Sequence, residues 1–254
     1  MSEAPKPFSV LGLPVHLLDD YPRWLRSRLQ QGIGTHVVTL NAEMTMQAEC
    51  NDTLAGVITQ AELVIPDGAG VVLYLRLQGK PIRRLPGIEL AESLLQSLGQ
   101  VGARESVFFY GGAPGIAEAA AAVWQQQVPA LNVVGTQHGY LTQEEQEKLR
   151  QTLTTLQPQL IFVGLGVPRQ ELWIAQHRSL CPQASWIGVG GSFDIWAGVK
   201  SRAPGWLADN HLEWLYRLYQ EPWRWRRMLA LPKFAWKALL HRLTQRRQIG
   251  QQLP

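Results

Sequence analysis

The sequence predicts an α/β fold, in which a mostly parallel sheet is covered by helices on both faces and is followed by a basic helical appendage. Two observations support this prediction. Between residues 35 and 191, short β-branched runs alternate with longer helical patterns, which is typical of parallel strands joined by crossover helices. After Pro204 the alternation stops and only helical patterns continue. We therefore expect an α/β core over residues 1–202 and an appendage over residues 203–254.

Six runs are apolar enough to form strands that are buried on both faces, as central strands of a parallel sheet are. Because helical patterns fill the intervals, the expected architecture is Rossmann-like. Two helix starts have a chemical basis: Pro114 is compatible with a first helical turn, and Thr142 with Glu145 forms a capping-box pattern. The expected strands are 36–40, 62–65, 106–110, 131–135, 160–164 and 185–189, and the expected helices are 43–60, 68–78, 88–100, 114–127, 142–156 and 169–178.

Charge is distributed unevenly along the chain. Residues 1–199 carry 13 Lys and Arg against 17 Asp and Glu, whereas residues 200–254 carry 11 against 3, together with five of the ten Trp. Trp beside Arg and Lys suits a membrane interface or a nucleic-acid surface. The apolar stripe from Phe234 to Leu243 fits a helix that lies in a membrane surface. We expect this appendage to meet an anionic partner and its helices to break at Pro222 and Pro232.

Several classes of protein are excluded by pattern. No window reaches the ~18 to 20 apolar residues of a membrane span, and the first eight residues lack the apolar region of a secretory signal, so a cytoplasmic location is expected. Only Cys50 and Cys181 are present, and we expect both to be buried, in a reducing compartment. The sequence contains no Asp-x-Asp, His-x-x-x-His or paired-Cys pattern, so no metal is expected.

The ends of the expected strands carry the candidate site, because ligands of open α/β sheets bind there. Glycines at these ends let backbone N–H groups approach a phosphate closely, although a tight turn explains any one of them alone. Their spacing lacks the third glycine of a dinucleotide fingerprint, which disfavours an NAD enzyme. The strand-end residues of interest are Thr39, Asn41, Asp67, Gly111, Gly112, Gly164, Gln170, Glu171 and Asp194.

Asp67 follows an apolar strand, where partial burial would raise its pKa and favour a role as proton acceptor. By local pattern alone, an Asp-Gly pair is more often a turn residue that bonds to its own backbone. A diphosphate that leaves a metal-free site needs cationic partners, and guanidinium groups grip phosphate oxygens bidentately. A solvated surface charge is the alternative for each arginine. The candidate cations are Arg84, Arg202, Arg217, Arg224 and Arg227.

An ordered run of motifs extends over most of the chain, from about Thr35 to Arg227. The motifs are Thr39-x-Asn41, Pro66-Asp67-Gly68, Arg84 with Gly87, Phe108 to Pro114, Gly139-Tyr140, Val163 to Glu171, Gly188 to Asp194, Arg202-Ala203-Pro204 and Glu213 to Leu218. In this order they resemble the WecG/TagA/CpsF family, glycosyltransferase family 26. Such a run is much harder to obtain by chance than any single motif.

The resemblance implies an inverting, metal-independent glycosyltransferase that uses no cofactor. The donor would be UDP-N-acetylmannosamine or its uronic acid, and the acceptor a polyprenyl-diphosphate-linked N-acetylglucosamine. Products of such enzymes feed surface polysaccharide or cell wall polymer synthesis. The resemblance also implies a peripheral protein on the cytoplasmic face of the membrane, and a homo-oligomer is compatible with it.

Site roles follow from the resemblance residue by residue. Asp67 would be the base that deprotonates the acceptor hydroxyl, and Thr39 and Asn41 would line the sugar pocket. The nucleotide would be held by Tyr140, Gln170 and Asp194, and the donor diphosphate by Arg217, Arg224 and Arg227 of the appendage. Arg84, Gly111, Gly112 and Gly164 complete the expected substrate-binding set.

The chain departs from the family pattern at Arg169, where Lys is common and where the change keeps the charge but not the geometry, and over one longer segment. Family members usually read Glu-Arg-Val-Thr-Gly-x-Asp where this chain has Arg83 to Glu89, with Pro86 in place of Thr, and a polar contact near the acceptor is expected to change. Two alternatives stay open at this point. Another nucleotide-sugar enzyme, such as an epimerase, would bind NAD, and a nucleic-acid-binding protein would use the basic tail to bind DNA with strong salt dependence.

Overall fold

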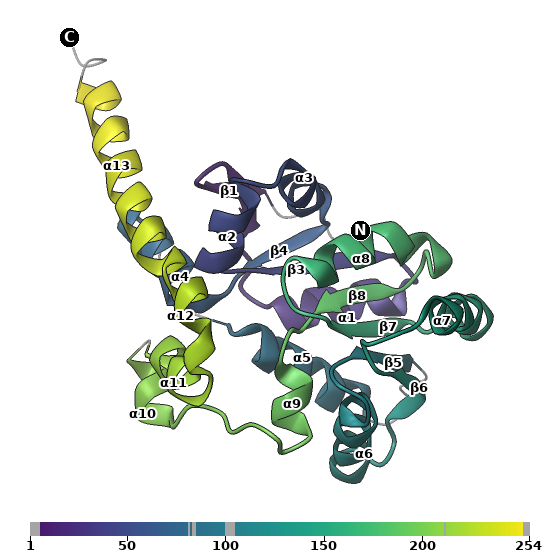
Figure 1. Cartoon of the computed structure of the whole chain (residues 1–254). Helices are drawn as coiled ribbons and strands as arrows, with labels where there is room; N and C mark the ends of the chain where they lie inside the picture. The colour runs from purple at the N-terminus through teal and green to yellow at the C-terminus, as the bar shows by residue number, and fades with distance from the viewer. Residues whose placement is uncertain (1–5, 81, 83–84, 100–104, 211, 251–254) are drawn as a thin grey trace.

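The computed structural model describes residues 6–80, 82, 85–99, 105–210 and 212–250. Its centre is a six-stranded parallel sheet with the order β4-β3-β8-β7-β5-β6 (Figure 1). Each expected strand is present with its ends within one or two residues of the prediction, which confirms the α/β, Rossmann-like fold. The strands are β3 (Thr35–Leu40), β4 (Leu63–Pro66), β5 (Ser106–Gly111), β6 (Asn132–Gln137), β7 (Leu160–Gly164) and β8 (Ser185–Gly188).

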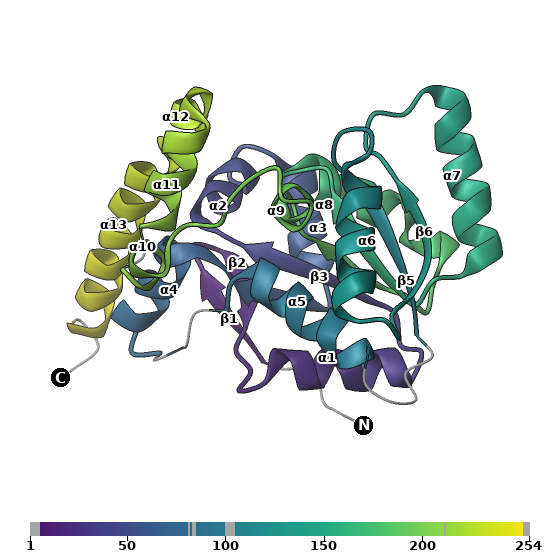
Figure 2. The same ribbon diagram turned by 90° about the horizontal axis from the view of Figure 1, so that it is seen from below.

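Helices cover both faces of the sheet, because side chains of each strand point alternately to either side. In β5, Val107 and Phe109 pack into the core of one face, and Phe108 and Tyr110 into the core of the other. The first face is covered by α1 (Tyr21–Gln30), α5 (Gly87–Leu98), α6 (Ile116–Gln127) and α9 (Ser192–Trp196) (Figure 2). The second is covered by α2 (Ala42–Ala48), α3 (Asp52–Gln60), α4 (Gly68–Leu77), α7 (Gln143–Leu156) and α8 (Arg169–His177), which a short 3-10 turn, η1 (Arg178–Leu180), extends.

Helix starts differ from the prediction at two places. The helix expected over 43–60 is two helices, because the side chain of Asn51 accepts a hydrogen bond of 3.0 Å from Leu54 N and starts α3. Pro114 lies before α6 rather than in its first turn, since Gly115 intervenes with φ +85°. The capping box at α7 is confirmed: Thr142 Oγ1 accepts from Glu145 N, and Glu145 Oε2 accepts from Thr142 N.

An antiparallel hairpin that was not predicted precedes the sheet. It consists of β1 (Pro7–Val10) and β2 (Leu13–His16), and its apolar side chains join the core under α2, α3 and α4. His16 fastens it to the sheet, because His16 Nδ1 accepts a hydrogen bond of 2.8 Å from Val64 N of β4. Tyr21 at the start of α1 donates its hydroxyl hydrogen to the carbonyl oxygen of His16.

The appendage is helical, as expected. It contains α10 (Gly205–Asp209), α11 (Glu213–Gln220), a 3-10 turn η2 (Pro222–Arg224), α12 (Trp225–Met228) and the long α13 (Ala230–Gly250), which runs beside α2 and α4 (Figure 1). Pro222 begins η2, but the break expected at Pro232 is wrong. Pro232 is the third residue of α13, where a backbone N–H has no partner within the helix and can be dispensed with.

Candidate functional site

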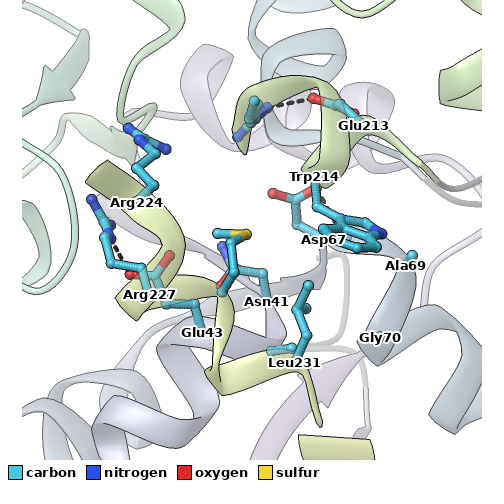
Figure 3. A pocket seen from close by; sticks show the side chains of 14 residues that line it. Asn41, Glu43, Asp67, Ala69, Gly70, Glu213, Trp214, Arg224, Arg227 and Leu231 are labelled. Atoms are coloured by element: carbon cyan, nitrogen blue, oxygen red, sulfur yellow. Dashed lines mark hydrogen bonds and ion pairs between the residues drawn. The ribbon is translucent and has the colours of Figure 1, made fainter. Parts of the chain in front are cut away.

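A cleft lies between the carboxyl edge of the sheet and the appendage (Figure 3). One wall is formed by the starts of α2 and α4, which follow β3 and β4, and the other by α11, α12 and the start of α13. Its volume is about 120 Å³, which is smaller than the range of about 300–1,000 Å³ found for small-molecule sites. We call it the Asp67 cleft. Its lining residues are Asn41, Ala42, Glu43, Asp67, Gly68, Ala69, Gly70, Glu213, Trp214, Arg217, Arg224, Arg227, Met228 and Leu231.

Asn41 and Asp67 lie side by side because they follow neighbouring parallel strands. Leu40 pairs with Pro66 in the sheet, and Asp67 N donates a hydrogen bond of 2.8 Å to Leu40 O. Each residue starts a helix: Asn41 Oδ1 accepts from Met44 N at 3.0 Å, and Asp67 Oδ1 accepts from Gly68 N at 2.7 Å. The turn-type hydrogen bond expected for Asp67 is therefore present, and the half-buried carboxylate also lines the cleft.

Three arginines form the opposite wall, and each is paired with a carboxylate. Arg217 binds Glu213 four residues earlier in α11, and Arg224 Nε lies 2.5 Å from Glu221 Oε2. Burial lowers the pKa of Arg224 while Glu221 opposes that effect, and a guanidinium stays protonated in proteins. The structure thus places Asp67 and these guanidinium groups across one cleft.

Three acidic residues pair with these arginines, and sequence reasoning gave none of them a role. Glu213 and Glu221 stand at helical spacing from Arg217 and Arg224, so charge spacing could have indicated them. Glu43 gave no such signal, because it lies in α2 and meets Arg227 of α12 from a distant part of the chain, with 2.5 Å between Arg227 Nε and Glu43 Oε1.

One fully buried side chain of the appendage packs into the core, with Leu231 and Ala238 beside it. Phe234 of α13 is 2% exposed and packs against Tyr74 of α4, with ring centroids 6.2 Å apart. Gly70 lies beside this contact: a Cβ there would be 3.5 Å from the Phe234 ring, an ordinary contact, and 3.1 Å from the Ala42 side chain. His241 Nδ1 and the Tyr74 hydroxyl share a hydrogen bond of 2.9 Å, and Lys237 pairs with Glu49, the residue that follows α2.

A second cleft adjoins the first and shares Glu213, Arg217 and Arg224 with it. It also contains Gly191 and Ser192 after β8, together with Lys200, Arg202 and Glu221. Lys200 Nζ lies 2.8 Å from Asp194 Oδ2 and 3.1 Å from Glu221 Oε1. Burial disfavours the charge of Lys200, but the two carboxylates outweigh it and raise its pKa. Asp194 thus contacts this cleft through its ion pair with Lys200. Arg202 pairs with Glu89 of α5.

The remaining predicted residues lie at other strand ends. Thr39 is buried in β3, and its methyl group lies beneath Gly87, where any side chain would collide with it. Arg84 lies outside the described residues. Gly112 N donates to Gly164 O at 3.0 Å, and a side chain on Gly111, which has φ +134°, would collide with the backbone of Gly164. These three glycines let the ends of β5 and β7 converge.

Tyr140 and Gln170 are separated from the Asp67 cleft. Tyr140 is exposed in a third cleft, which it shares with Tyr110, Leu165, Arg169 and Trp173. Gln170 is buried at the start of α8, and its carboxamide is bonded to protein groups. The structure thus brings together the expected base and diphosphate residues, while the expected nucleotide residues spread along the sheet edge.

Other features bear on the sequence expectations. Among the described residues, no three His, Cys, Asp or Glu side chains gather as metal ligands would. No helix in the described ranges is both long and apolar enough to cross a membrane. Cys181 is buried, but Cys50 is exposed, so the expectation of two buried cysteines is wrong for Cys50.

Comparison with known proteins adds a family and relatives. The sequence model of the glycosyl transferase WecG/TagA/CpsF family matches residues 8–248. The chain is similar to two proteins named N-acetylglucosaminyldiphosphoundecaprenol N-acetyl-beta-D-mannosaminyltransferase. The protein from Bacillus spizizenii is 38% identical over 214 residues, covering 84% of this chain and 82% of the relative. The protein from Bacillus subtilis is 33% identical over 208 residues, covering 82% and 80%. The family resemblance is confirmed, and the epimerase and nucleic-acid alternatives are not favoured.

Proposed function

We propose that this chain, which belongs to the WecG/TagA/CpsF family of glycosyltransferases, transfers N-acetylmannosamine or its uronic acid from UDP to a polyprenyl-diphosphate-linked N-acetylglucosamine. One observation carries the proposal most directly: a carboxylate and three guanidinium groups face one cleft from opposite walls. The names of the two Bacillus relatives support the acceptor and the sugar.

The reaction that fits this arrangement is an inverting displacement. The acceptor hydroxyl oxygen attacks the anomeric carbon from the side of Asp67, and its proton passes to the Asp67 carboxylate. The bond from the anomeric carbon to the diphosphate breaks on the opposite side, and its electron pair stays on the UDP oxygen. Arg217, Arg224 and Arg227 stabilise the charge that develops there.

The arginines reach the diphosphate by exchanging partners. Each is held by a carboxylate of the protein, namely Glu213, Glu221 or Glu43. A diphosphate carries more charge than one carboxylate and offers bidentate acceptors, so it competes well for these guanidinium groups. Because the arginines supply the cationic charge, the proposed reaction uses no metal ion and no cofactor.

We place the protein on the cytoplasmic membrane surface, where a lipid-linked acceptor would be met. The appendage presents Trp223 and Trp236 with 71% and 62% of their surfaces exposed, and its sequence is rich in Lys and Arg. Amphipathic rings beside basic side chains suit the headgroup region of an anionic bilayer.

Asp67→Asn tests the base assignment. Asn starts a helix as well as Asp does, so the fold should persist, but the amide cannot accept the proton. We expect transfer of sugar to a lipid-diphosphate-N-acetylglucosamine acceptor to fall by about 10²- to 10⁴-fold, with UDP affinity retained. Asn51→Asp is the matched control, because it exchanges one cap residue for the other at α3, outside the cleft. Near-normal turnover by Asp67→Asn would contradict the assignment.

Vesicle sedimentation tests the membrane assignment separately. The double variant Trp223→Ser, Trp236→Ser should bind vesicles of anionic lipid more weakly than the unaltered protein, while transfer to a short, soluble acceptor continues. Leu156→Ser provides the control, because Leu156 is an exposed apolar residue that lies on α7, outside the appendage. Equal vesicle binding by all three proteins would refute the docking role of the appendage.

A further inference from the structure

A chain of buried hydrogen bonds crosses from the sheet to the start of α8. His36 of β3 and Glu171 and Gln170 of α8 are 2%, 0% and 2% exposed. His36 Nε2 lies 2.7 Å from Glu171 Oε2, and Gln170 Nε2 donates to Glu171 Oε1 at 3.0 Å. With Glu171 ionised, both neighbours donate to it, so each of its oxygens is satisfied.

The chain ends on two strand-end loops. Gln170 Oε1 accepts one hydrogen bond of 3.1 Å from Gly166 N, in the loop after β7, and another of 3.0 Å from Gly190 N, in the loop after β8. Both glycines have positive φ, +74° and +52°. A single carboxamide oxygen therefore joins two tightly turned loops.

The sheet leaves room for this chain at Gly188 of β8. A Cβ at that position would lie 2.5 Å from Glu171 Oε1 and would also collide with Gln170 Nε2. Any side chain at Gly188 would push the two polar residues away from the strand. The space above β8 is thus filled by Gln170 and Glu171 themselves.

This chain of hydrogen bonds controls the orientation of the Gln170 carboxamide. A carboxamide can turn over and exchange its oxygen and nitrogen, and a reversed Gln170 would point its NH₂ group at two N–H donors. The Glu171 carboxylate prevents this reversal because it accepts only from the nitrogen. His36 in turn holds the carboxylate. Buried ionic or polar groups make a protein little more stable than apolar residues of equal size would. We therefore attribute the role of the hydrogen bonds among His36, Glu171 and Gln170 to orienting the carboxamide rather than to stabilising the fold.

The two loops that Gln170 joins also line the clefts beside it. Leu165 lines the third cleft, next to Tyr140. Gly191 lines the second cleft, opposite Arg217 and Arg224. The spacing between the loops therefore sets the spacing between these two parts of the sheet edge.

We infer that His36 and Glu171 are positioning residues that act through Gln170 and hold the β7 and β8 loops at the spacing that the donor nucleotide requires. The inference rests on the proposed function, because it takes the UDP-sugar as the ligand of these loops. Neither residue touches the reacting atoms. Their loss should weaken donor binding equally in the ground state and in the transition state, which raises KM and leaves kcat unchanged.

Donor kinetics and UDP calorimetry on the full chain test the inference. For Glu171→Leu and His36→Phe, we expect the KM for the UDP-sugar and the Kd for UDP to rise about tenfold, which corresponds to about 1.4 kcal/mol, with the KM for the acceptor unchanged. Glu171→Gln should restore most of the affinity, since its oxygen can still accept from Gln170 Nε2. Leu153→Ala, at a buried position of α7, provides a control with lowered Tm and no change in Kd.

The outcomes separate the inference from the function on which it rests. If the unaltered protein binds UDP and the variants bind it equally well, or if Leu153→Ala raises the Kd as much as they do, the positioning role is overturned. Failure of the unaltered protein to bind UDP would overturn the donor assignment and the inference with it. Should His36→Phe not fold, Gly188→Ala tests the same link from the strand side. Unchanged UDP affinity in that variant would also refute the inference.

Discussion

Docking of the appendage should depend on Phe234 more than on any ion pair that spans the same interface. Replacing a buried Phe by Ala costs about 3–5 kcal/mol, because the cavity left against Tyr74 and Gly70 is not refilled. The pairs Arg227–Glu43 and Lys237–Glu49 are substantially exposed at their basic ends, and such pairs contribute about 0–1 kcal/mol each. Phe234→Ala should therefore lower the ratio of docked to undocked appendage by about a hundredfold to a few thousandfold.

Limited proteolysis reads out this change. Phe234→Ala should make residues 203–254 sensitive to trypsin at concentrations that leave the core intact, and transfer activity should fall with the docked fraction because one wall of the Asp67 cleft is lost. Trp236→Ala is the matched control, since Trp236 lies on the same helix but is 62% exposed. Equal protease sensitivity of the two variants would show that Phe234 does not hold the appendage.

Three further predictions concern pH, thiol reactivity and metal ions. Burial lowers the pKa of His16 below 6.5, so the unfolded chain takes up a proton that the folded chain does not. The free energy of unfolding should accordingly fall as the pH drops below about 6.5. In His16→Asn, the free energy of unfolding should depend less on pH in this range, and an unchanged pH dependence would contradict the lowered pKa of His16. Burial also raises the pKa of Cys181 to about 11, so Ellman's reagent should label Cys50 alone in the native protein at pH 8, and labelling of both thiols would be inconsistent with this packing. Finally, EDTA should leave transfer intact, and inhibition that Mg²⁺ reverses would argue against a metal-free mechanism.

Most of the sheet could be predicted from the sequence because strands buried on both faces have a continuous apolar pattern. The strands Leu160–Gly164 and Ser185–Gly188 are examples, because each lies within one residue of the range that the apolar pattern predicted. The expectation of burial on both faces is wrong for the edge strand β6, which has no fully buried residue. The β1–β2 hairpin could not be predicted in the same way, since only Val10 of β1 is buried and Pro7–Val10 has no continuous apolar run. Its position is fixed by a tertiary hydrogen bond from Val64 to His16, which leaves no local pattern.

Site residues were predictable to different degrees for a similar reason. Family motifs indicated Asp67 and the arginines, and the parallel register of β3 and β4 explains why Asp67 lies beside Asn41. No motif indicated that Glu43 meets Arg227, because that contact depends on how α13 packs on α2. The sequence pattern also could not show whether the Gln170 side chain faces a ligand or the protein, because the orientation of that side chain depends on both Glu171 and His36.

The two walls of the Asp67 cleft have a consequence for synthesis of the protein. One wall follows β3 and β4, near the start of the chain, whereas the other extends to Leu231, 43 residues beyond the end of β8 at Gly188. At about 5–20 residues per second, the ribosome adds that stretch about two to nine seconds after the last strand. A nascent chain with a complete sheet still has Asp67 open to water. The complete Asp67 cleft therefore forms only after the sheet has been synthesised.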